Sequence, residues 1–286
     1  MRERWPALHE ARRRDASRRL PFALREPGGP RRRVGSVARS LVDALAAQPG
    51  IEVAADAVTL VAPRAERDAL WAGLNLALRD AGLLAGWRGE SVAVRAHAGG
   101  DVLAVVERAA ARCFGLLTLA AHANGFVADA RGRPTSLWIA ERAATKATDP
   151  GRLDNLIGGG VPHGQSPRET LLREGFEEAG LDSAEVALAT PGRVIEIVRD
   201  VPEGLQHELL YAHDLALPAG RTPVNRDGEV AAFALHAIGA AIAVAASGAM
   251  TVDAELVTLD FALRHALLPA GEAARLAPRL DALCPR

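Results

Sequence analysis

The chain has 286 residues, of which 24% are charged, and its formal net charge is -1. This length is sufficient for two domains, each with its own apolar core. A nearly neutral chain lacks the overall positive charge that favours nucleic-acid binding, so we expect no nucleic acid among its partners. Its two cysteines, Cys113 and Cys284, have neither zinc-ligand spacing nor a disulfide framework. This usage predicts a cytoplasmic protein without zinc.

The first part of the chain is expected to contain a short lead-in and a smaller domain. Residues 1–33 are rich in Arg, Pro and Gly and contain no long apolar stretch of the kind found in a signal peptide. Residues 34–125 alternate apolar segments with amphipathic ones. We expect helices in 40–47, 65–81 and 107–115, and strands in 58–61, 92–94 and 102–106.

Residues 126–286 are expected to form a larger second domain. The segment 230–252 contains no charged residue, but it consists mainly of small residues such as Ala and Gly. Its tendency to enter a membrane is therefore weak, and we expect a strand end followed by a buried helix, with no membrane partner. Further strands are expected in 137–140, 193–198 and 208–215, and residues 156–157 lead into a glycine-rich loop.

The helix after this loop has clear start and stop signals. Ser166 suits the N-cap, Pro167 suits the first helical position, and Glu169 completes a capping box. Gly180 is a natural C-terminal stop. At about 100° per residue, the helix separates an apolar face from an acidic one. The apolar face contains Leu171, Leu172, Gly175, Phe176 and Ala179, and the acidic face contains Glu174, Glu177 and Glu178.

The acidic face indicates a site for a divalent cation. Carboxylates at positions i, i+3 and i+4 repel one another unless a cation lies between them. Oxygen ligands of this kind suit Mg²⁺, with Mn²⁺ as the alternative, better than Zn²⁺. The competing interpretation is a solvated acidic helix face, and the residues around the helix favour the metal site.

These residues resemble the Nudix box, G-x5-E-x7-R-E-U-x-E-E-x-G-U, in which U is a bulky aliphatic residue. Two positions depart from it. Gln165 replaces the first box glutamate and cannot act as a base. Gly175 replaces an aliphatic residue and should weaken the helix by about 1 kcal/mol, unless it permits a close approach. The matching residues are Gly159, Arg173, Glu174, Glu177, Glu178, Gly180 and Leu181.

Flanking motifs resemble the thiamine-pyrophosphokinase-related branch of the Nudix hydrolases, whose members have a distinctive N-terminal region. The resemblance implies an α/β (α+β) fold, with a Nudix α/β/α sandwich and a smaller mixed α/β N-terminal domain. It also implies a Mg²⁺-dependent hydrolase that converts thiamine diphosphate, or its oxo and oxy analogues, to the monophosphate and phosphate. The matching motifs are residues 87–90, 107–110, 114–115, 124–126, 137–142, 146–155, 204–211, 227–230 and 260–265.

Two other functions stay open. The first is a broader hydrolase of nucleoside diphosphate derivatives, which would have the same metal site and a different pocket for the base. The second is a non-catalytic Nudix domain that binds a phosphorylated metabolite. Gln165 keeps the second alternative open, whereas the three intact glutamates of the helix favour catalysis.

The resemblance also implies catalytic roles for individual residues. Arg173 would orient a carboxylate of the helix. The catalytic base is open between two later glutamates, and we assign Glu229 with Glu208 as the competing choice, although either residue could be a surface charge. The residues expected to hold the metal are Glu174, Glu177 and Glu178.

Substrate contacts are expected from the loop, the only lysine and an aromatic residue. Lys146, the only lysine in the chain, would contact a phosphate, unless it is a solvated loop charge. Trp138, together with Phe126 and Trp87, could stack on an aromatic ring of the substrate. A tryptophan in a strand is, however, more often part of the core. The remaining expected contacts are Gly159, Gly160 and Gln165.

Overall fold

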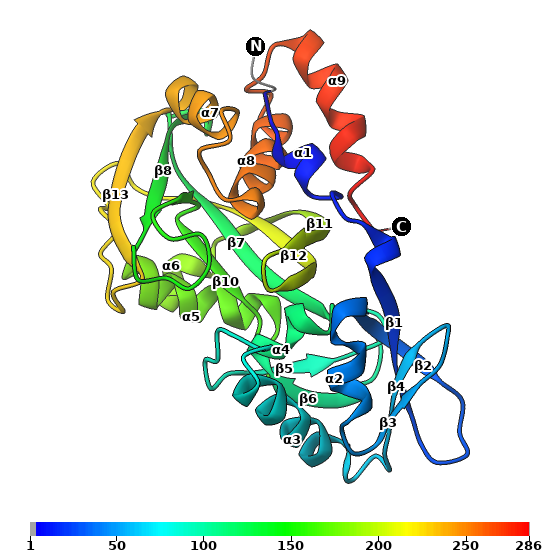
Figure 1. The fold of residues 1–286 in the computed structure, drawn as a ribbon. Coiled ribbons are helices and arrows are strands. Elements are labelled where there is room, and N and C mark those ends of the chain that lie inside the picture. The colour runs from blue at the N-terminus through cyan, green and yellow to red at the C-terminus, as the bar shows by residue number, and fades with distance from the viewer. Residues whose placement is uncertain (1–3, 286) are drawn as a thin grey trace.

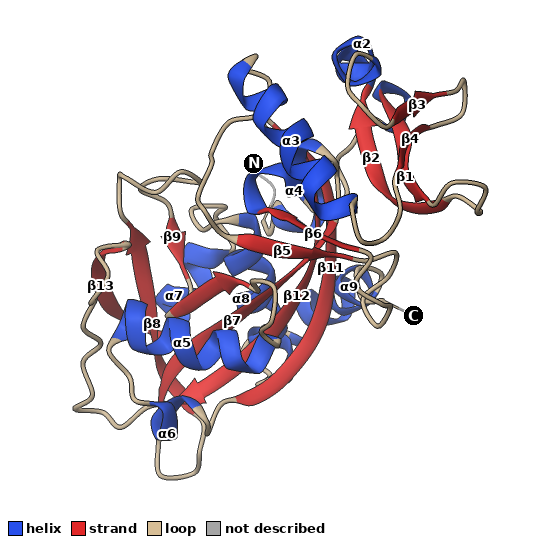
Figure 2. Ribbon diagram, turned by 90° about the horizontal axis from the view of Figure 1, so that it is seen from below, coloured by secondary structure: helices blue, strands red, loops and turns tan. Residues whose placement is uncertain are grey.

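The computed structural model describes residues 4–285. It shows a mixed α/β architecture, which confirms the predicted fold class. Figures 1 and 2 show a large sheet with helices on both faces and a group of smaller sheets beside it. Along residues 4–285, no helix is long and apolar enough to cross a membrane.

Seven strands form the large sheet. They are β7 (Leu117–Ala128), β8 (Pro134–Arg142), β9 (Leu153–Asp154), β10 (Ile157–Gly160), β11 (Thr190–Val201), β12 (Gly204–Ala216) and β13 (Val230–Ala237). The main path runs β11-β12-β7-β8-β13, while β10 pairs with β7 and β9 pairs with β8. β12 and β7 are parallel, and the other neighbours are antiparallel. The sheet is therefore mixed.

Helices cover both faces of the large sheet. One face packs against α5 (Pro167–Ala179) and α6 (Ser183–Val186). Successive side chains of a strand point to opposite faces, so Ala121 packs toward α5 whereas Ala120 packs toward the other layer. The resulting three layers form an α/β/α sandwich. The second helical layer consists of α1 (Ala7–Glu10), α7 (Ile238–Ala245), α8 (Val252–Arg264) and α9 (Ala270–Asp281).

Residues 19–116, called the N-terminal unit below, have a separate buried core. The unit contains a four-stranded sheet of order β2-β1-β4-β3 and a two-stranded sheet of β5 and β6. Its strands are β1 (Arg19–Arg25), β2 (Arg32–Ala38), β3 (Ile51–Val53), β4 (Val58–Val61), β5 (Ser91–Val94) and β6 (Ala104–Glu107). Its helices are η2 (Arg39–Leu41), α2 (Val42–Ala46), α3 (Arg67–Asp80) and α4 (Arg108–Cys113), and η1 (Ala16–Arg18) precedes it.

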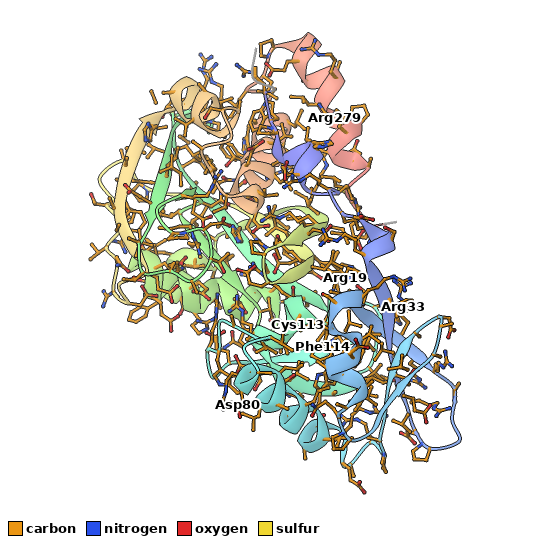
Figure 3. The ribbon with its side chains drawn as sticks, viewed as in Figure 1. Arg19, Arg33, Asp80, Cys113, Phe114 and Arg279 are labelled. Carbon is orange, nitrogen blue, oxygen red and sulfur yellow. The ribbon has the colours of Figure 1, made fainter. Side chains whose placement is uncertain are left out.

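Arg19 joins the start of β1 to the end of α4. Its Nη2 donates to the carbonyl oxygen of Cys113 at 3.1 Å, and Figure 3 shows the two residues together with Phe114. The ring of Phe114 lies 4.8 Å from that of Phe22 and 5.3 Å from that of Trp71, centroid to centroid. These aromatic contacts hold α4 against the four-stranded sheet.

The expected domain limits at residues 33 and 125 do not coincide with the ends of structural elements. Residues 1–3 lie outside the described part, but Trp5 and Leu8 are buried in the helical layer that contains α8. The backbone N–H of Ala7 also donates to Glu255 Oε1 at 2.8 Å. The lead-in is thus folded, because its apolar residues are removed from water. The limit at residue 125 falls inside β7, whose buried run continues to both sides.

Most expected elements are confirmed, with shifted ends. The helix after the glycine-rich loop begins and ends as predicted, with a capping box at Ser166 and a left-handed Gly180 at φ 63°. The segment 230–252 forms β13 followed by α7. The helix expected in 40–47 is shorter, because its first turn is the 3-10 helix η2.

Candidate functional site

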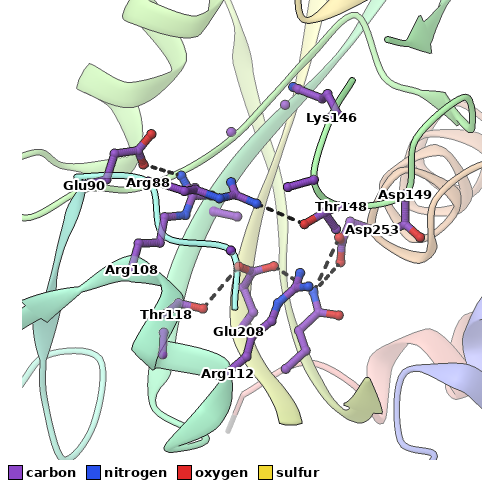
Figure 4. Close-up of a pocket in the computed structure, with 18 of the residues that line it drawn as sticks. Arg88, Glu90, Arg108, Arg112, Thr118, Lys146, Thr148, Asp149, Glu208 and Asp253 are labelled. Carbon is purple, nitrogen blue, oxygen red and sulfur yellow. Dashed lines mark hydrogen bonds and ion pairs between the residues drawn. The ribbon is translucent and has the colours of Figure 1, made fainter. Parts of the chain in front are cut away.

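A cavity of about 760 Å³ lies between the carboxylate helix α5, the large sheet and the N-terminal unit (Figure 4). Its lining comes from segments far apart in the chain, including α4, β7, the loop after β8 and the loop before β13. Among the residues expected to form the site, those that line it are Lys146, Gly159, Gly160, Arg173, Glu174, Glu177 and Glu229.

The glycines of β10 allow α5 to lie close to the sheet. A methyl group placed on Gly159 would lie 2.6 Å from Cγ of Glu174, which is too close for a real contact. The absent side chain therefore leaves the space that the Glu174 carboxylate occupies. The backbone N–H of Gly158 donates to Glu178 Oε2 at 2.8 Å. The glycines of β10 therefore contact Glu174 and Glu178, which are two of the three expected metal ligands.

Arg173 holds two carboxylates of its own helix. Its Nη2 donates to Glu174 Oε1 at 2.7 Å, and its Nη1 donates to Glu177 Oε2 at 2.6 Å. Charge-assisted hydrogen bonds of this length fix the direction of both carboxylates. The geometry agrees with the orienting role expected for Arg173, which stays a prediction.

Lys146 lies between two glutamates from other segments. Its Nζ donates to Glu178 Oε1 at 3.1 Å and forms an ion pair with Glu229. Burial lowers the pKa of Lys146, but the charges of both glutamates outweigh burial and raise the pKa overall. Lys146 therefore stays protonated, and it is more than a solvated loop charge.

Burial disfavours the charged form of two glutamates of α5, and a cation would stabilise that form. Glu174 and Glu178 are only 8% and 4% exposed. Burial raises the pKa of both carboxyl groups, that of Glu178 to about 7, against the opposing charges of Arg173 and Lys146 respectively. Buried carboxylate oxygens whose charged form is disfavoured in this way suit a hard divalent cation.

The glutamates of α5 are not gathered around one point. Within residues 4–285, no three His, Cys, Asp or Glu side chains converge closely enough to hold a metal ion. Arg173 and Lys146 instead engage the three carboxylates separately. Carboxylate oxygens are suitable ligands for a divalent cation. To bind one, these carboxylates would replace a contact with Arg173 or Lys146 by a contact with the cation. The metal assignment stays a prediction.

The expected aromatic contacts lie elsewhere. Trp138 is 8% exposed and belongs to the core between the sheet and α5, and Phe126 is buried on the opposite face. Both strand residues serve the core because their rings cover apolar neighbours. Trp87 is exposed outside the cavity, where Arg79 lies 5.1 Å from its ring centroid. The cavity is therefore lined mainly by polar and charged groups.

Gln165 does not line the large cavity. Its Oε1 accepts hydrogen bonds from Thr170 Oγ1 at 3.0 Å and from Arg173 Nε at 3.4 Å. It thus supports the arginine that holds the helix carboxylates. Because the Gln165 side chain faces the start of α5, its position does not favour a direct contact with substrate.

Both candidates for the catalytic base line the cavity. Glu229 is held by Lys146, whereas Glu208 accepts from Thr118 Oγ1 at 3.2 Å and from Gln206 Nε2 at 3.1 Å. Figure 4 shows Glu208 near Asp253, which accepts a second bond from the Gln206 amide at 3.1 Å. Burial and then the charge of Glu208 raise the pKa of Asp253 to about 6.

Several residues of the cavity were not among the expected site residues. Arg88 and Arg108 come from the N-terminal unit; they lie in the matching motifs 87–90 and 107–110, but no role in the site was expected for them. Asp253 lies in the first turn of α8, where an acidic residue is ordinary. The packing of the N-terminal unit against the sheet brings the two arginines to the cavity, and the packing of α8 beside β12 brings Asp253 there.

Comparison with known proteins agrees with the box. Residues 118–257 match the NUDIX domain. The chain is 35% identical to "Nudix hydrolase 24, chloroplastic" and 34% identical to "Nudix hydrolase 20, chloroplastic", both of Arabidopsis thaliana, over 192 residues each. The alignments cover 67% of this chain and 52% and 51% of those relatives.

An uncharacterized protein of Saccharomyces cerevisiae is 33% identical over 192 residues, which cover 63% of this chain and 56% of that protein. The chain spans about half the length of the curated relatives it matches. The match to the NUDIX domain contains the whole box, from Gly159 to Leu181. The chain therefore carries a domain of the Nudix family over residues 118–257.

Proposed function

We propose that this chain hydrolyses diphosphate bonds in small molecules with the help of a bound divalent cation. The observation that carries the proposal is the position of α5, which presents Glu174 and Glu177 to the large cavity beside the glycines of β10. The match to the NUDIX domain and the names of the two plant relatives support the class of reaction.

The metal would be held by the carboxylates of α5. When bound, Mg²⁺, or Mn²⁺ as the alternative, neutralises charge on the phosphate oxygens and orients them for attack by water. The chain itself positions the carboxylates through Arg173, and it keeps a protonated amine at Lys146 on the same side of the cavity. The ligands proposed are Glu174, Glu177 and Glu178.

In the proposed reaction, water attacks a phosphorus atom and the bond from that phosphorus to the bridging oxygen breaks. The products are a monophosphate and inorganic phosphate, and the proton of the water passes to a base. Glu229 is our choice for this base, because it lines the cavity and forms an ion pair with Lys146. Glu208 is the second choice, since it lines the same cavity.

We further propose thiamine diphosphate, or its oxo and oxy analogues, as the substrate. The proposal rests on the flanking motifs at residues 87–90, 137–142 and 146–155, and a cavity of about 760 Å³ is within the usual size for a small ligand. Since Trp138 lies in the core, recognition of the substrate ring would depend on polar contacts rather than on stacking.

Release of phosphate and monophosphate tests both levels of the proposal. The substrates would be thiamine diphosphate, oxythiamine diphosphate, ADP-ribose and a panel of nucleoside diphosphates, each with and without Mg²⁺. Preference for the thiamine compounds supports the narrow proposal, and preference for nucleotides reduces it to the broader hydrolase. Binding without release from any compound would favour the non-catalytic alternative.

A cytoplasmic location is also a proposal. It depends on the two cysteines, which are both free in the described part of the chain. The plant relatives are named chloroplastic, which is a statement about those proteins. Microscopy of the full-length natural protein with a fluorescent fusion would decide the compartment.

A further inference from the structure

Arg88 reaches the cavity from the N-terminal unit without a carboxylate partner. Its Nη2 donates to Thr148 Oγ1 at 3.1 Å, and its backbone N–H donates to Glu107 Oε1 at 2.9 Å. Among residues 4–285, Arg88 has no ion pair. Thr148 belongs to the same loop as Lys146, so the Arg88 guanidinium lies at the edge of the cavity near that loop (Figure 4).

Arg108 reaches the same cavity over the glycine-rich strand. A methyl group placed on Gly160 would lie 2.8 Å from the Cζ atom of Arg108. The glycine therefore permits the guanidinium to lie against β10. Arg108 Nη1 donates to Glu90 Oε2 at 2.7 Å, and the side chain of Glu90 is 47% exposed. Glu90 is therefore paired directly with Arg108, whereas Arg88 has only the longer-range charges of Glu90 and Glu229 to oppose burial and the neighbouring arginines.

The charge of Arg108 adds to the electrostatic cost of the Arg88 guanidinium. Burial lowers the pKa of Arg88, and the nearby charge of Arg108 lowers it further, while the charges of Glu90 and Glu229 oppose this only in part. The other acidic groups near them already have partners, because Glu229 pairs with Lys146 and Glu203 pairs with Arg112. An anion in the cavity would relieve this repulsion.

We propose that Arg88 and Arg108 form an anion subsite that binds one phosphate group of the diphosphate substrate. This inference rests on the proposed function and deepens it, since it makes the N-terminal unit part of the substrate site. Guanidinium groups donate paired hydrogen bonds to phosphate oxygens. With the metal helix on one side and the two arginines on the other, the site would retain a diphosphate better than a monophosphate product.

Binding of methylenediphosphonate, a diphosphate analogue that water does not cleave, tests the subsite. Its Kd is measured calorimetrically with Mg²⁺ at the same concentration in both solutions, for the wild type, Arg88→Ala and Arg108→Ala. We expect each variant to raise Kd by about tenfold or more, because a hydrogen bond to a charged group is lost. Arg133→Ala, which removes a 70% exposed arginine paired with Asp129 outside the cavity, is the matched control and should leave Kd unchanged.

Folding defects are separated by the choice of variants. Arg88→Ala breaks one side-chain hydrogen bond and no ion pair, so its circular dichroism and thermal midpoint should match those of the wild type. Arg88→Lys tests the geometry, since lysine keeps the charge without the paired donors. An intermediate Kd for this variant supports the subsite.

The result for the subsite is distinguishable from that for hydrolysis. A raised Kd in both alanine variants supports the subsite even if the wild type hydrolyses no compound of the panel, in which case only the proposed function fails. Folded Arg88→Ala and Arg108→Ala proteins with the wild-type Kd for methylenediphosphonate would overturn the subsite, even if the wild type hydrolyses diphosphates.

Discussion

The Nζ atom of Lys146 lies 3.1 Å from Oε1 of Glu178, although 32 residues separate them in the chain. The lysine also pairs with Glu229, so three segments meet at one partly buried amine. The side chains of Lys146 and Glu178 are only 13% and 6% exposed. The only lysine of the chain is therefore built into the site that contains the box.

Replacing Lys146 with Ala should lower the free energy of unfolding by about 3 kcal/mol, because it leaves the buried Glu178 carboxylate without its cation. Denaturant unfolding of Lys146→Ala, Glu178→Gln and the double variant measures this coupling. The double variant should be more stable than Lys146→Ala alone. Equal stability of these two proteins would show that the unpaired Glu178 carboxylate is not the cause of the loss.

The same lysine variant has an expected effect on catalysis. Lys146→Ala should raise KM more than it lowers kcat, since a phosphate contact is lost while the α5 carboxylates remain. Steady-state kinetics with the best diphosphate of the panel would measure both constants. An unchanged KM would restrict Lys146 to a structural role.

Glu177→Gln and Glu178→Gln should each lower turnover by more than about 100-fold, since even the groups around metal ligands are worth 10- to 100-fold. Both variants should keep the fold, as judged by circular dichroism. Glu169→Gln is the matched control, because a glutamine can also complete the capping box at Ser166. Near-wild-type turnover in both test variants, with Mg²⁺ present, would contradict the metal assignment.

Gly175→Ala should destabilise the protein, although alanine is the better helix former. The added methyl group would lie 2.6 Å from Cγ2 of Val186 in α6, so it would overpack the contact by about 1 to 3 kcal/mol. Gly73→Ala is the matched control in α3, where no atom lies within 4 Å of the added methyl. That variant should be more stable by about 1 kcal/mol. Thermal unfolding of the pair would show opposite signs, and equal signs would refute the packing explanation.

Glu185→Gln should destabilise the protein by about 1 kcal/mol at pH 7, as expected for an ion pair near the surface. The hydrogen bond from Arg221, whose Nε lies 2.6 Å from Glu185 Oε1, lowers the pKa of Glu185 to about 2. The unfolded carboxyl group titrates near its ordinary pKa, so the stabilisation is full above about pH 4.5 and is lost as the pH falls toward 2.

The pH series for Glu185→Gln consists of unfolding curves between pH 7 and pH 3. The difference from the wild type should shrink as the pH falls. Glu66→Gln, which removes an exposed carboxylate of the N-terminal unit, is the control and should show little difference at any pH. A constant deficit for Glu185→Gln would mean that the ion pair with Arg221 is not its cause.

The sequence alone determined the helix of the box and most of the elements around it. Ser166, Pro167, Glu169 and Gly180 act through hydrogen bonds and backbone preferences within a few residues, so their meaning does not depend on the rest of the fold. Short apolar segments likewise predict strands such as β4 and β12, in which consecutive residues are buried.

Tertiary structure decided where individual side chains lie. Phe176 belongs to the predicted apolar face of α5, but it is 49% exposed and lies under Arg226, since the core ends before it. Trp138 is in the core, and Gly175 has a purpose only because Val186 lies against it. Arg88 reaches the cavity through contacts with residues 60 positions away. Long-range packing sets these positions, and composition and local spacing contain no record of it.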